Sequence, residues 1–478
     1  MTSPNIVLVV MDTARAEDVG IGAAPGTVPF LDSLAGSGTT FTDIRANAPW
    51  TLPSHATLFS GRLTTDHGTH AGHLQFDVQA TLASCLTDND YRTIAVSNNT
   101  WVSPEFGFDT GFEEFLTTWK LYQDSAEFGG ISQTRSGVLD TLRGIAEAWE
   151  GNPVKNLANL LFGRFLRRRC DDGARRTNRL IRNRLEGNDR PLFLFVNYLE
   201  PHLPYDPPDE HAREWLPDDA TLEDARGVNQ DAWAYITGSE PMTDRDFKLL
   251  RALYRAELAY LDERLSDLHD LFERNADRET VFLFIGDHGE NIGDNGLMDH
   301  QYSLAETLLS VPLVAFGGHF EDGRRIEKPV QVADLYPTVL DIATGEVPGD
   351  TVGRSLCRVD SLPEDRPLFA EYVTPQPRIE TLKQRYDATV DLDQYDRALQ
   401  AVRRGRYKLV RGSDGSRHLY DLTGDGERED LSESHSDKVE ELDELLDGRL
   451  GPPETTARDD RELDGTVHDR LEELGYLR

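Results

Sequence analysis

The sequence contains few cysteines and no long apolar run. Its three cysteines (Cys85, Cys170 and Cys357) lie far apart and form no CxxC pair. This argues against a disulfide framework or a zinc–thiolate site and fits a reducing cytosol. No apolar run approaches the ~18 residues that a membrane-spanning helix requires, so we expect no membrane span. The N-terminus also lacks the pattern of a signal peptide, and we therefore expect a cytoplasmic protein.

Lysine is scarce and acidic residues are in excess. Only seven of the 50 basic residues are lysines, which leaves 43 arginines, and the net charge is −35. Such a surface is typical of proteins from salt-loving cells, because the Debye length falls to ~3 Å at 1 M salt and self-repulsion is screened. The same charge repels phosphate backbones, so we expect no nucleic-acid partner.

Short apolar runs without polar alternation indicate buried parallel strands. They are Ile6–Met11, Thr93–Ser97, Leu192–Tyr198, Thr280–Ile285 and Val311–Phe316. Apolar residues recur at steps of three and four from Phe247 to Phe272, before the strand expected at Thr280–Ile285, and this spacing predicts a helix. We expect an α/β sandwich with a mostly parallel central sheet in residues 1–345.

After residue 345 the sequence changes character. Ala401–Arg404, Tyr407–Val410 and Arg417–Leu422 are separated by turn signals and predict an antiparallel sheet, with a helix at Lys438–Leu450 packed on it. We expect a small C-terminal α+β subdomain in residues 346–455. Residues 456–478 should form a tail with a short helix at Val467–Leu474.

Residues 155–184 are rich in arginine despite the acidic chain. One interpretation is an anchor for an anionic substrate or a membrane surface. The other, which we favour, is a solvated helix face that pairs with acidic residues elsewhere.

Polar side chains follow four of the expected strands, at the edge where ligands bind in open α/β sheets. Asp12 follows the first strand, Asn98 and Asn99 the second, Glu200 and His202 the third, and Asp287 and His288 the fourth. Each alone is often a turn residue. Together, Asp12, Asp287 and His288 supply two oxygens and one nitrogen, which suits Zn²⁺ or Mn²⁺ better than Ca²⁺.

Thr51 opens the segment Thr51–Gly61, which predicts a short helix with Pro53 at its first position. A hydroxyl beside a helix N-terminus and a divalent metal can ionise and attack a phosphorus or sulfur centre. The alternative is that Thr51 only caps the helix, as threonine often does.

The order of these motifs resembles the sulfatase family of the alkaline phosphatase superfamily. The motifs are Asp12, Thr51–Gly61, Pro201–Tyr205, Asp287–Glu290 and Val332–Thr338. The resemblance implies an alkaline-phosphatase-like fold, a metal bound by Asp12, Thr51, Asp287 and His288, and Thr51 as nucleophile. It also implies that His55, His202 and His300 act on the substrate anion, with His202 or His300 as general acid or base, and that Asn98 lies near a substrate-binding position.

The sequence also departs from the family pattern. Sulfatases carry Cys or Ser at the nucleophile position and convert it to formylglycine, which threonine cannot form. The family's paired aspartates are here Asp12 and Thr13, and His55 and His300 stand where members have Arg and Lys. These histidines stabilise an anion as cations only if they are protonated.

We therefore expect a hydrolase of sulfate or phosphate esters with one divalent metal, Mn or Zn, and a small-molecule, glycan or lipid ester as substrate. Phosphodiester or phosphonate ester hydrolysis and phospho-group transfer remain alternatives. A binding protein that has lost its activity is a third, against which the intact metal ligands argue.

Overall fold

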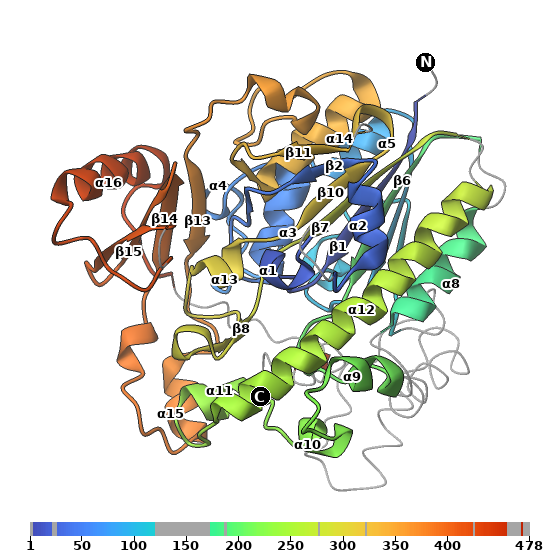
Figure 1. Ribbon diagram of the computed structural model, residues 1–478. Coiled ribbons are helices and arrows are strands. Elements are labelled where there is room, and N and C mark those ends of the chain that lie inside the picture. Colours follow the sequence, from blue (N-terminus) through green and yellow to red (C-terminus); the bar gives the residue numbers. More distant parts are fainter. Residues whose placement is uncertain are drawn as a thin grey trace, which may run out of the picture.

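An eight-stranded sheet forms the centre of the computed structural model (Figure 1), which describes residues 3–21, 26–119, 173–185, 189–275, 278–320, 323–423, 426–456 and 470–471. Across the sheet the strands are β11 (Arg324–Ile326), β2 (Thr39–Phe41), β10 (Leu313–Phe316), β7 (Thr280–Gly286), β1 (Asn5–Met11), β6 (Leu192–Tyr198), β4 (Arg92–Ser97) and β5 (Glu114–Thr117). The expected α/β fold with a mostly parallel central sheet is confirmed.

One strand runs against the expectation. β10, expected to be parallel, pairs antiparallel with both of its neighbours, β7 and β2. The chain leaves β7 at the carboxyl edge and re-enters β10 from that same edge, through the short elements β8 (Asn291–Ile292), β9 (Met298–Asp299) and α13 (Glu306–Leu309). A parallel strand would need a crossover over the sheet face, which a short return at one edge does not provide.

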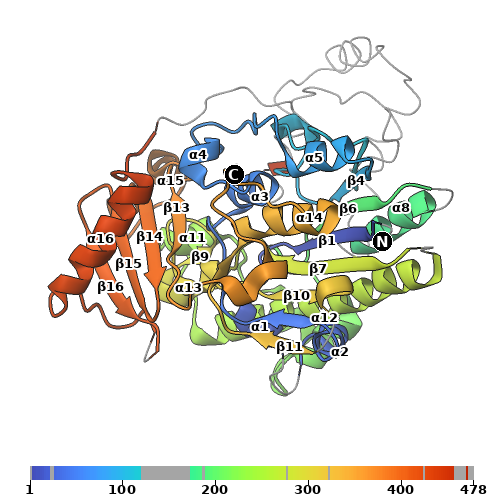
Figure 2. The ribbon, with the colours of Figure 1, turned by 90° about the horizontal axis from the view of Figure 1, so that it is seen from above.

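Helices cover both faces of the sheet (Figure 2). Along β1, Val7, Val9 and Met11 face a core shared with α2 (Pro29–Ala35), α8 (Ala174–Leu185) and α12 (Asp244–Asn275). Ile6, Leu8 and Val10 face the other core, with α3 (Thr51–Ser60), α5 (Leu82–Asp88) and α14 (Leu335–Thr344). Burial on both faces explains why the strands read as continuous apolar runs.

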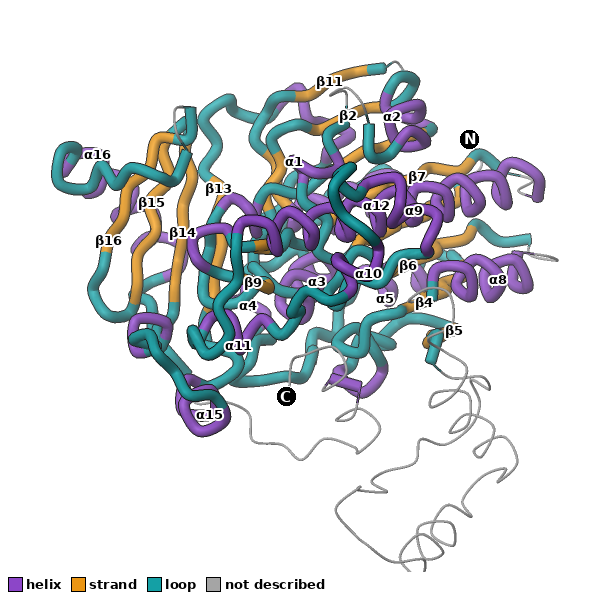
Figure 3. The backbone as a smooth tube through the Cα atoms, turned by 60° about the horizontal axis from the view of Figure 1, so that its bottom comes forward, coloured by secondary structure: helices purple, strands orange, loops and turns teal. Residues whose placement is uncertain are grey.

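The expected C-terminal sheet is present, with one strand more than the sequence indicated. β13 (Leu368–Tyr372), β14 (Leu399–Arg404), β15 (Tyr407–Gly412) and β16 (Arg417–Asp421) pair antiparallel in that order. Helix α16 (Ser436–Leu450) packs Leu442 and Leu446 onto this sheet, which stands beside the central one (Figure 3).

Shorter elements complete the described chain. They are α1 (Ala16–Val19), α4 (Thr64–His67), α9 (Asp209–Trp215), α10 (Leu222–Arg226), α11 (Ala232–Ile236), α15 (Ile379–Arg385), β3 (Ile44–Arg45), β8 (Asn291–Ile292), β9 (Met298–Asp299) and β12 (Val330–Gln331). None of the described helices is long and apolar enough to cross a membrane.

Two expectations fall largely outside the described residues. Of the tail helix expected at Val467–Leu474, only residues 470–471 are described, and they are helical. Of the arginine-rich stretch, the described part forms α8, whose Ile181 is buried while Arg184 pairs with Glu114 at 3.3 Å. For this part the structure agrees with a helix in which one arginine, Arg184, pairs with an acidic residue.

Candidate active site

The polar residues at the carboxyl ends of the strands meet in one buried site. β1 lies between β6 and β7 in the sheet, so Asp12 lies between the residues that follow those two strands. Asp12, Thr51, Asp287 and His288 are all fully buried, and His202 is 1% exposed. Burying several charged or ionisable groups together is costly unless a ligand or partners compensate them.

Four side-chain atoms converge as a metal site would require. The ligand atoms of Asp12, Asp287 and His288 lie within 4.8 Å of one another. His288 Nε2 is 3.3 Å from Asp287 Oδ2, 3.8 Å from Asp12 Oδ1 and 3.2 Å from the Thr51 hydroxyl. Neither Asp12 Oδ1 nor Asp287 Oδ2 accepts a hydrogen bond from any described residue. A cation bound between these atoms would satisfy both oxygens.

Surrounding hydrogen bonds orient these ligands. The Nδ1 of His288 lies 2.9 Å from the Gly289 carbonyl, to which it can donate, and this leaves the Nε2 lone pair for a metal. Asp287 Oδ1 accepts from the backbone N–H groups of His288 and Thr13 at 2.9 and 3.3 Å. Thr13 has a φ of 56°, a left-handed conformation that costs free energy in a threonine and recurs at functional sites.

The charges of the site also call for a cation. Burial raises the pKa of the Asp12 and Asp287 carboxyl groups, and the nearby Asp12 charge raises that of Asp287 further. Burial lowers the pKa of His288, so its ring is neutral and able to act as a ligand. Two carboxylates, one imidazole and one hydroxyl suit a four-coordinate divalent ion such as Zn²⁺.

Thr51 occupies the first position of α3, not a cap position. Trp50 is the N-cap residue and makes no side-chain cap bond, and Pro53 stands at the third helical position instead of the expected first. The Thr51 hydroxyl also accepts a 3.3 Å hydrogen bond from Asn99 Nδ2. The hydroxyl therefore points into the site, beside the free N–H groups of the helix N-terminus.

His55 is neutral and enclosed. Its Nδ1 lies 2.9 Å from the Thr51 carbonyl, its Nε2 lies 3.0 Å from Asn197 Nδ2, and the ring packs edge-on against Phe195. Burial lowers the pKa of His55 to about 4. We expected a cation at this position if the ring were protonated; the surroundings favour the neutral ring, which positions the first turn of α3.

His300 has the opposite environment. Its Nδ1 lies 3.0 Å from Asp299 Oδ1 and 3.4 Å from Glu290 Oε1, and all three residues are buried. Burial alone would lower the pKa of His300, but Asp299 and Glu290 raise it above its usual range. Its ring lies 4.6 Å from that of His288 and 5.2 Å from that of His202. His300 therefore supplies positive charge at the metal site.

His202 completes the group of histidines. Its Nδ1 faces the Leu203 carbonyl, and burial lowers its pKa to about 3. A neutral ring whose Nδ1 donates to that carbonyl is able to accept a hydrogen bond at Nε2.

The two adjacent asparagines that follow β4 have different partners. Asn98 Oδ1 accepts a 2.8 Å hydrogen bond from Thr177 on α8, and Glu200 Oε1 accepts one from the Ala174 N–H of the same helix. Asn99 instead donates to Asp12 Oδ2 at 2.7 Å as well as to Thr51. Sequence reasoning noted Asn99 but did not choose it, and it missed Glu290 and Asp299, although Glu290 follows Asp287 and His288 within one short motif.

Comparisons with known proteins identify the family. The family model described as Sulfatase matches residues 4–345. Human arylsulfatase K is 24% identical over 95% of this chain and 84% of its own length. The choline-sulfatase of Rhizobium meliloti is 25% identical over 88% of this chain and 81% of its own.

Solved structures share the fold. The phosphonate monoester hydrolase of Agrobacterium radiobacter superimposes with a TM-score of 0.66 at 20% identity, covering 93% of this chain and 94% of that one. BT4656, solved with its substrate D-glucosamine-2-N,6-O-disulfate, gives 0.67 at 16% identity, covering 94% and 97%. With the family model spanning the whole α/β domain and its buried site, the chain belongs to the sulfatase family of ester hydrolases.

Proposed function

We propose that this protein is a metal-dependent hydrolase of sulfate or phosphate esters in which Thr51 is the nucleophile. The observation that carries the proposal is the convergence of the Thr51 hydroxyl with His288 Nε2 and the uncompensated oxygens of Asp12 and Asp287. Threonine cannot form formylglycine, so the nucleophile is a plain hydroxyl.

Asp12, Asp287, His288 and Thr51 would hold the metal. A divalent cation there lowers the pKa of the Thr51 hydroxyl and withdraws charge from the ester oxygens. Thr51 Oγ, its proton lost to solvent, then attacks sulfur or phosphorus, while the bond to the leaving oxygen breaks. Pro53 has no N–H and the Ser54 N–H donates to the Trp50 carbonyl, so the N–H groups of Thr51 and Leu52 are those at the start of α3 that would favour negative charge on the ester.

His300 fits the role of general acid and base. The carboxylates of Asp299 and Glu290 hold its Nδ1 side and keep the ring protonated. As an imidazolium it stabilises the anion and gives one proton to the leaving oxygen. As a neutral ring it then takes a proton from the water that cleaves the Thr51 ester. The neutral His202 beside it orients the substrate.

The nucleophile favours phosphorus chemistry as a second candidate. A threonine alkoxide lacks the hydrate hydroxyl with which formylglycine expels sulfate, so its ester must be cleaved by water. Aryl sulfate, phosphate monoester, phosphodiester and phosphonate ester substrates, compared at equal concentration, separate these reactions. Product diverted to added glycerol would indicate transfer, and no turnover of any of them would favour a binding protein.

Thr51→Ala tests the covalent mechanism. We expect kcat/KM on the best substrate to fall by about 10³-fold or more, because removal of a nucleophile leaves only binding and electrostatic stabilisation. Thr51→Ser is the matched control and should keep activity within about tenfold, since it retains the hydroxyl. Full turnover by Thr51→Ala would contradict the proposal.

Metal removal tests the cofactor. A strong chelator should abolish activity, and Zn²⁺ or Mn²⁺ should restore it better than Ca²⁺, because an imidazole belongs to the ligand set. Metal analysis of the pure protein should give one ion per chain that is lost in Asp287→Asn. Two ions per chain would indicate that Glu290, Asp299 and His300, which could also hold a metal ion, bind a second one.

A further inference from the structure

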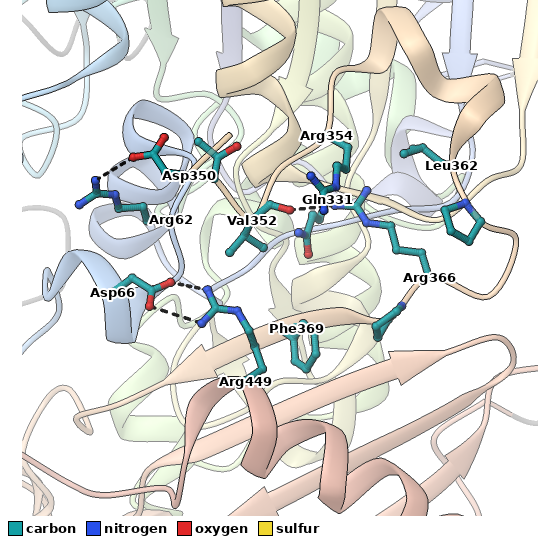
Figure 4. A pocket seen from close by; sticks show the side chains of 13 residues that line it. Arg62, Asp66, Gln331, Asp350, Val352, Arg354, Leu362, Arg366, Phe369 and Arg449 are labelled. Atoms are coloured by element: carbon teal, nitrogen blue, oxygen red, sulfur yellow. Dashed lines mark hydrogen bonds and ion pairs between the residues drawn. The ribbon is translucent and has the colours of Figure 1, made fainter. Parts of the chain in front are cut away.

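A second cavity lies away from the metal site, at the seam between the central domain and the C-terminal sheet (Figure 4). Its volume is about 750 Å³, within the range of small-molecule sites. We call it the seam cleft. It is lined by Arg62, Asp66, Gln331, Asp350, Thr351, Val352, Arg354, Leu362, Pro363, Arg366, Pro367, Phe369 and Arg449.

The charge of the seam cleft is opposite to that of the chain. Acidic residues outnumber Lys and Arg by 85 to 50 in the sequence, but the cleft has four arginines and two aspartates. A local excess of guanidinium groups in an otherwise negative surface attracts an anion to this place and to few others.

The four arginines differ in how fully they are neutralised. Arg366 donates two hydrogen bonds to the buried Asp334, at 2.7 and 2.8 Å. Arg62 meets Asp350 only at 3.7 Å, and the Asp350 side chain is 78% exposed. The Arg354 guanidinium forms no hydrogen bond or ion pair with any residue that the structure describes, although Figure 4 shows it pointing into the cleft.

Arg449 provides the fourth guanidinium. It comes from α16 of the C-terminal subdomain and pairs with Asp66 of α4 across the seam. Exposed pairs of this kind contribute only ~0–1 kcal/mol, so an incoming anion can compete for the guanidinium. Arg62, Arg354 and Arg449 thus remain available from three separate segments of the chain.

One wall of the cleft is apolar. Leu362, Pro363, Pro367 and Phe369 line it. A bare inorganic ion would leave this wall unused, whereas an organic ligand could pack an apolar group on it and direct its charge to the arginines.

The seam cleft is separate from the metal site. Thr51 begins α3, and Arg62 lies just beyond the last residue, Ser60, so about 15 Å of helix separates them. The walls are nevertheless tied to this helix. The Val352 N–H donates to the Gly61 carbonyl at 3.0 Å, and Gln331 Oε1 accepts from Asn47, four residues before Thr51, at 3.0 Å.

We propose that the seam cleft binds a sulfate, sulfonate or phosphate group carried on a partly apolar molecule. Arg354, Arg449 and Arg62 contact the charged oxygens, and the wall around Phe369 packs against the apolar part. The proposal does not depend on the nucleophile or on the metal. The ligand could be a substrate of this enzyme or an unrelated organic anion of the same chemistry.

Naphthalene-2-sulfonate is a suitable probe, because its carbon–sulfur bond is not an ester and it is not hydrolysed. Calorimetric titration of the full-length metal-loaded protein, at constant ionic strength, should show binding. The double variant Arg354→Ala/Arg449→Ala should weaken the affinity for the probe about tenfold, since each of its two substitutions removes a charge-assisted contact. Arg213→Ala/Arg274→Ala is the matched control, because neither arginine lines the cleft. Arg213 pairs with the exposed Asp209 within α9, and Arg274 pairs with the exposed Asp270 within α12.

Further measurements test where the probe binds and which of its chemical groups are recognised. Asp287→Asn should bind the probe as the wild type does, which distinguishes the seam cleft from the metal site. Inorganic sulfate should bind more weakly than the probe, and the neutral naphthalene-2-methanol should not bind. Hydrogen exchange should slow in residues 350–354 and 362–369 when the probe is present.

The proposal is overturned if the probe does not bind, or if Asp287→Asn abolishes binding while the cleft variants retain it. Equal affinity for inorganic sulfate and the probe would contradict the role of the apolar wall. If the double variant unfolds, Arg354→Ala alone serves, because the Arg354 guanidinium forms no hydrogen bond or ion pair with a described residue and its loss should leave the fold intact.

Discussion

At the scale of single residues, the surroundings of a side chain decide its charge more than its type does. His55 and His300 both stand where related proteins have a cation, and from the sequence they were equivalent. The Nδ1 of His55 lies 2.9 Å from the Thr51 carbonyl and 3.4 Å from one oxygen of Asp287, and its Nε2 faces Asn197, while the Nδ1 of His300 lies between the carboxyl groups of Asp299 and Glu290. Asp299 directly precedes His300 and Thr51 lies one helical turn before His55, but Glu290 and Asn197 come from other segments, so the sequence predicted the positions of the two histidines and not their protonation.

The two asparagines after β4 give a prediction at this scale. Asn99→Ala should weaken the affinity for Zn²⁺ about 10–100-fold, because the Asn99 carboxamide donates to the Asp12 carboxylate and the Thr51 hydroxyl. Asn98→Ala is the matched control and should change it less than about threefold, since Asn98 bonds to Thr177. Competition with a chromogenic chelator measures both. A larger loss of affinity in Asn98→Ala than in Asn99→Ala would contradict the role of Asn99 in positioning Asp12 and Thr51.

At the scale of elements, the sequence predicted which segments form strands and not how they run. The buried strands were found because their apolar residues are continuous, and α12 because its stripe is periodic. The direction of β10 depends on the path of the chain between Asp287 and Ser310, which apolar pattern does not encode. β13 was missed although prolines flank it on both sides, at Pro363 and Pro367 and at Pro375 and Pro377, because its pairing partner β14 begins 27 residues later and no hairpin signal joins the two.

The seam between the two parts of the chain holds a buried ion cluster on β15. Lys408, 1% exposed, donates to Glu306 and Glu427 at 2.8 Å and to the Leu304 carbonyl at 2.6 Å. Lys408→Met should destabilise the protein by about 3 kcal/mol at pH 7, because it removes the lysine ion pair of the partly buried Glu427 and leaves Glu306 paired with Arg45 alone. Lys438→Met is the control, since Lys438 pairs with Glu441 at the surface and should cost less than ~1 kcal/mol.

The same cluster predicts a dependence on pH. Burial alone would raise the pKa of Glu306, but Lys408 and Arg45 lower it to about 2 from an ordinary value of 4.5. A lowered folded-state pKa contributes stability above pH 4.5 that is lost as the pH falls toward 2. Urea unfolding at pH 7 and pH 3.5 should therefore show a smaller difference between wild type and Lys408→Met at the lower pH. A difference that grows on acidification would contradict this.

At the scale of the whole molecule, ion pairs with Lys and Arg cannot neutralise all of the acidic side chains. Even if each of the 50 Lys and Arg residues paired with one carboxylate, 85 − 50 = 35 acidic residues would remain. Their repulsion opposes the compact state over distances of about 10 Å in 0.1 M salt and about 3 Å in 1 M salt.

The melting temperature should therefore rise by at least about 5 °C between 0.1 M and 1 M KCl. KCl is preferred to sulfate, which also strengthens apolar burial and could occupy the anion sites. Sucrose at matched osmolality is the control, since it does not screen charge. It should raise the melting temperature of this protein by about as much as it raises that of a protein of balanced charge, and by much less than KCl does. A melting temperature that stays flat or falls with KCl would mean that the exposed carboxylates are too dispersed to oppose folding, and that the acidic composition has no need of high salt.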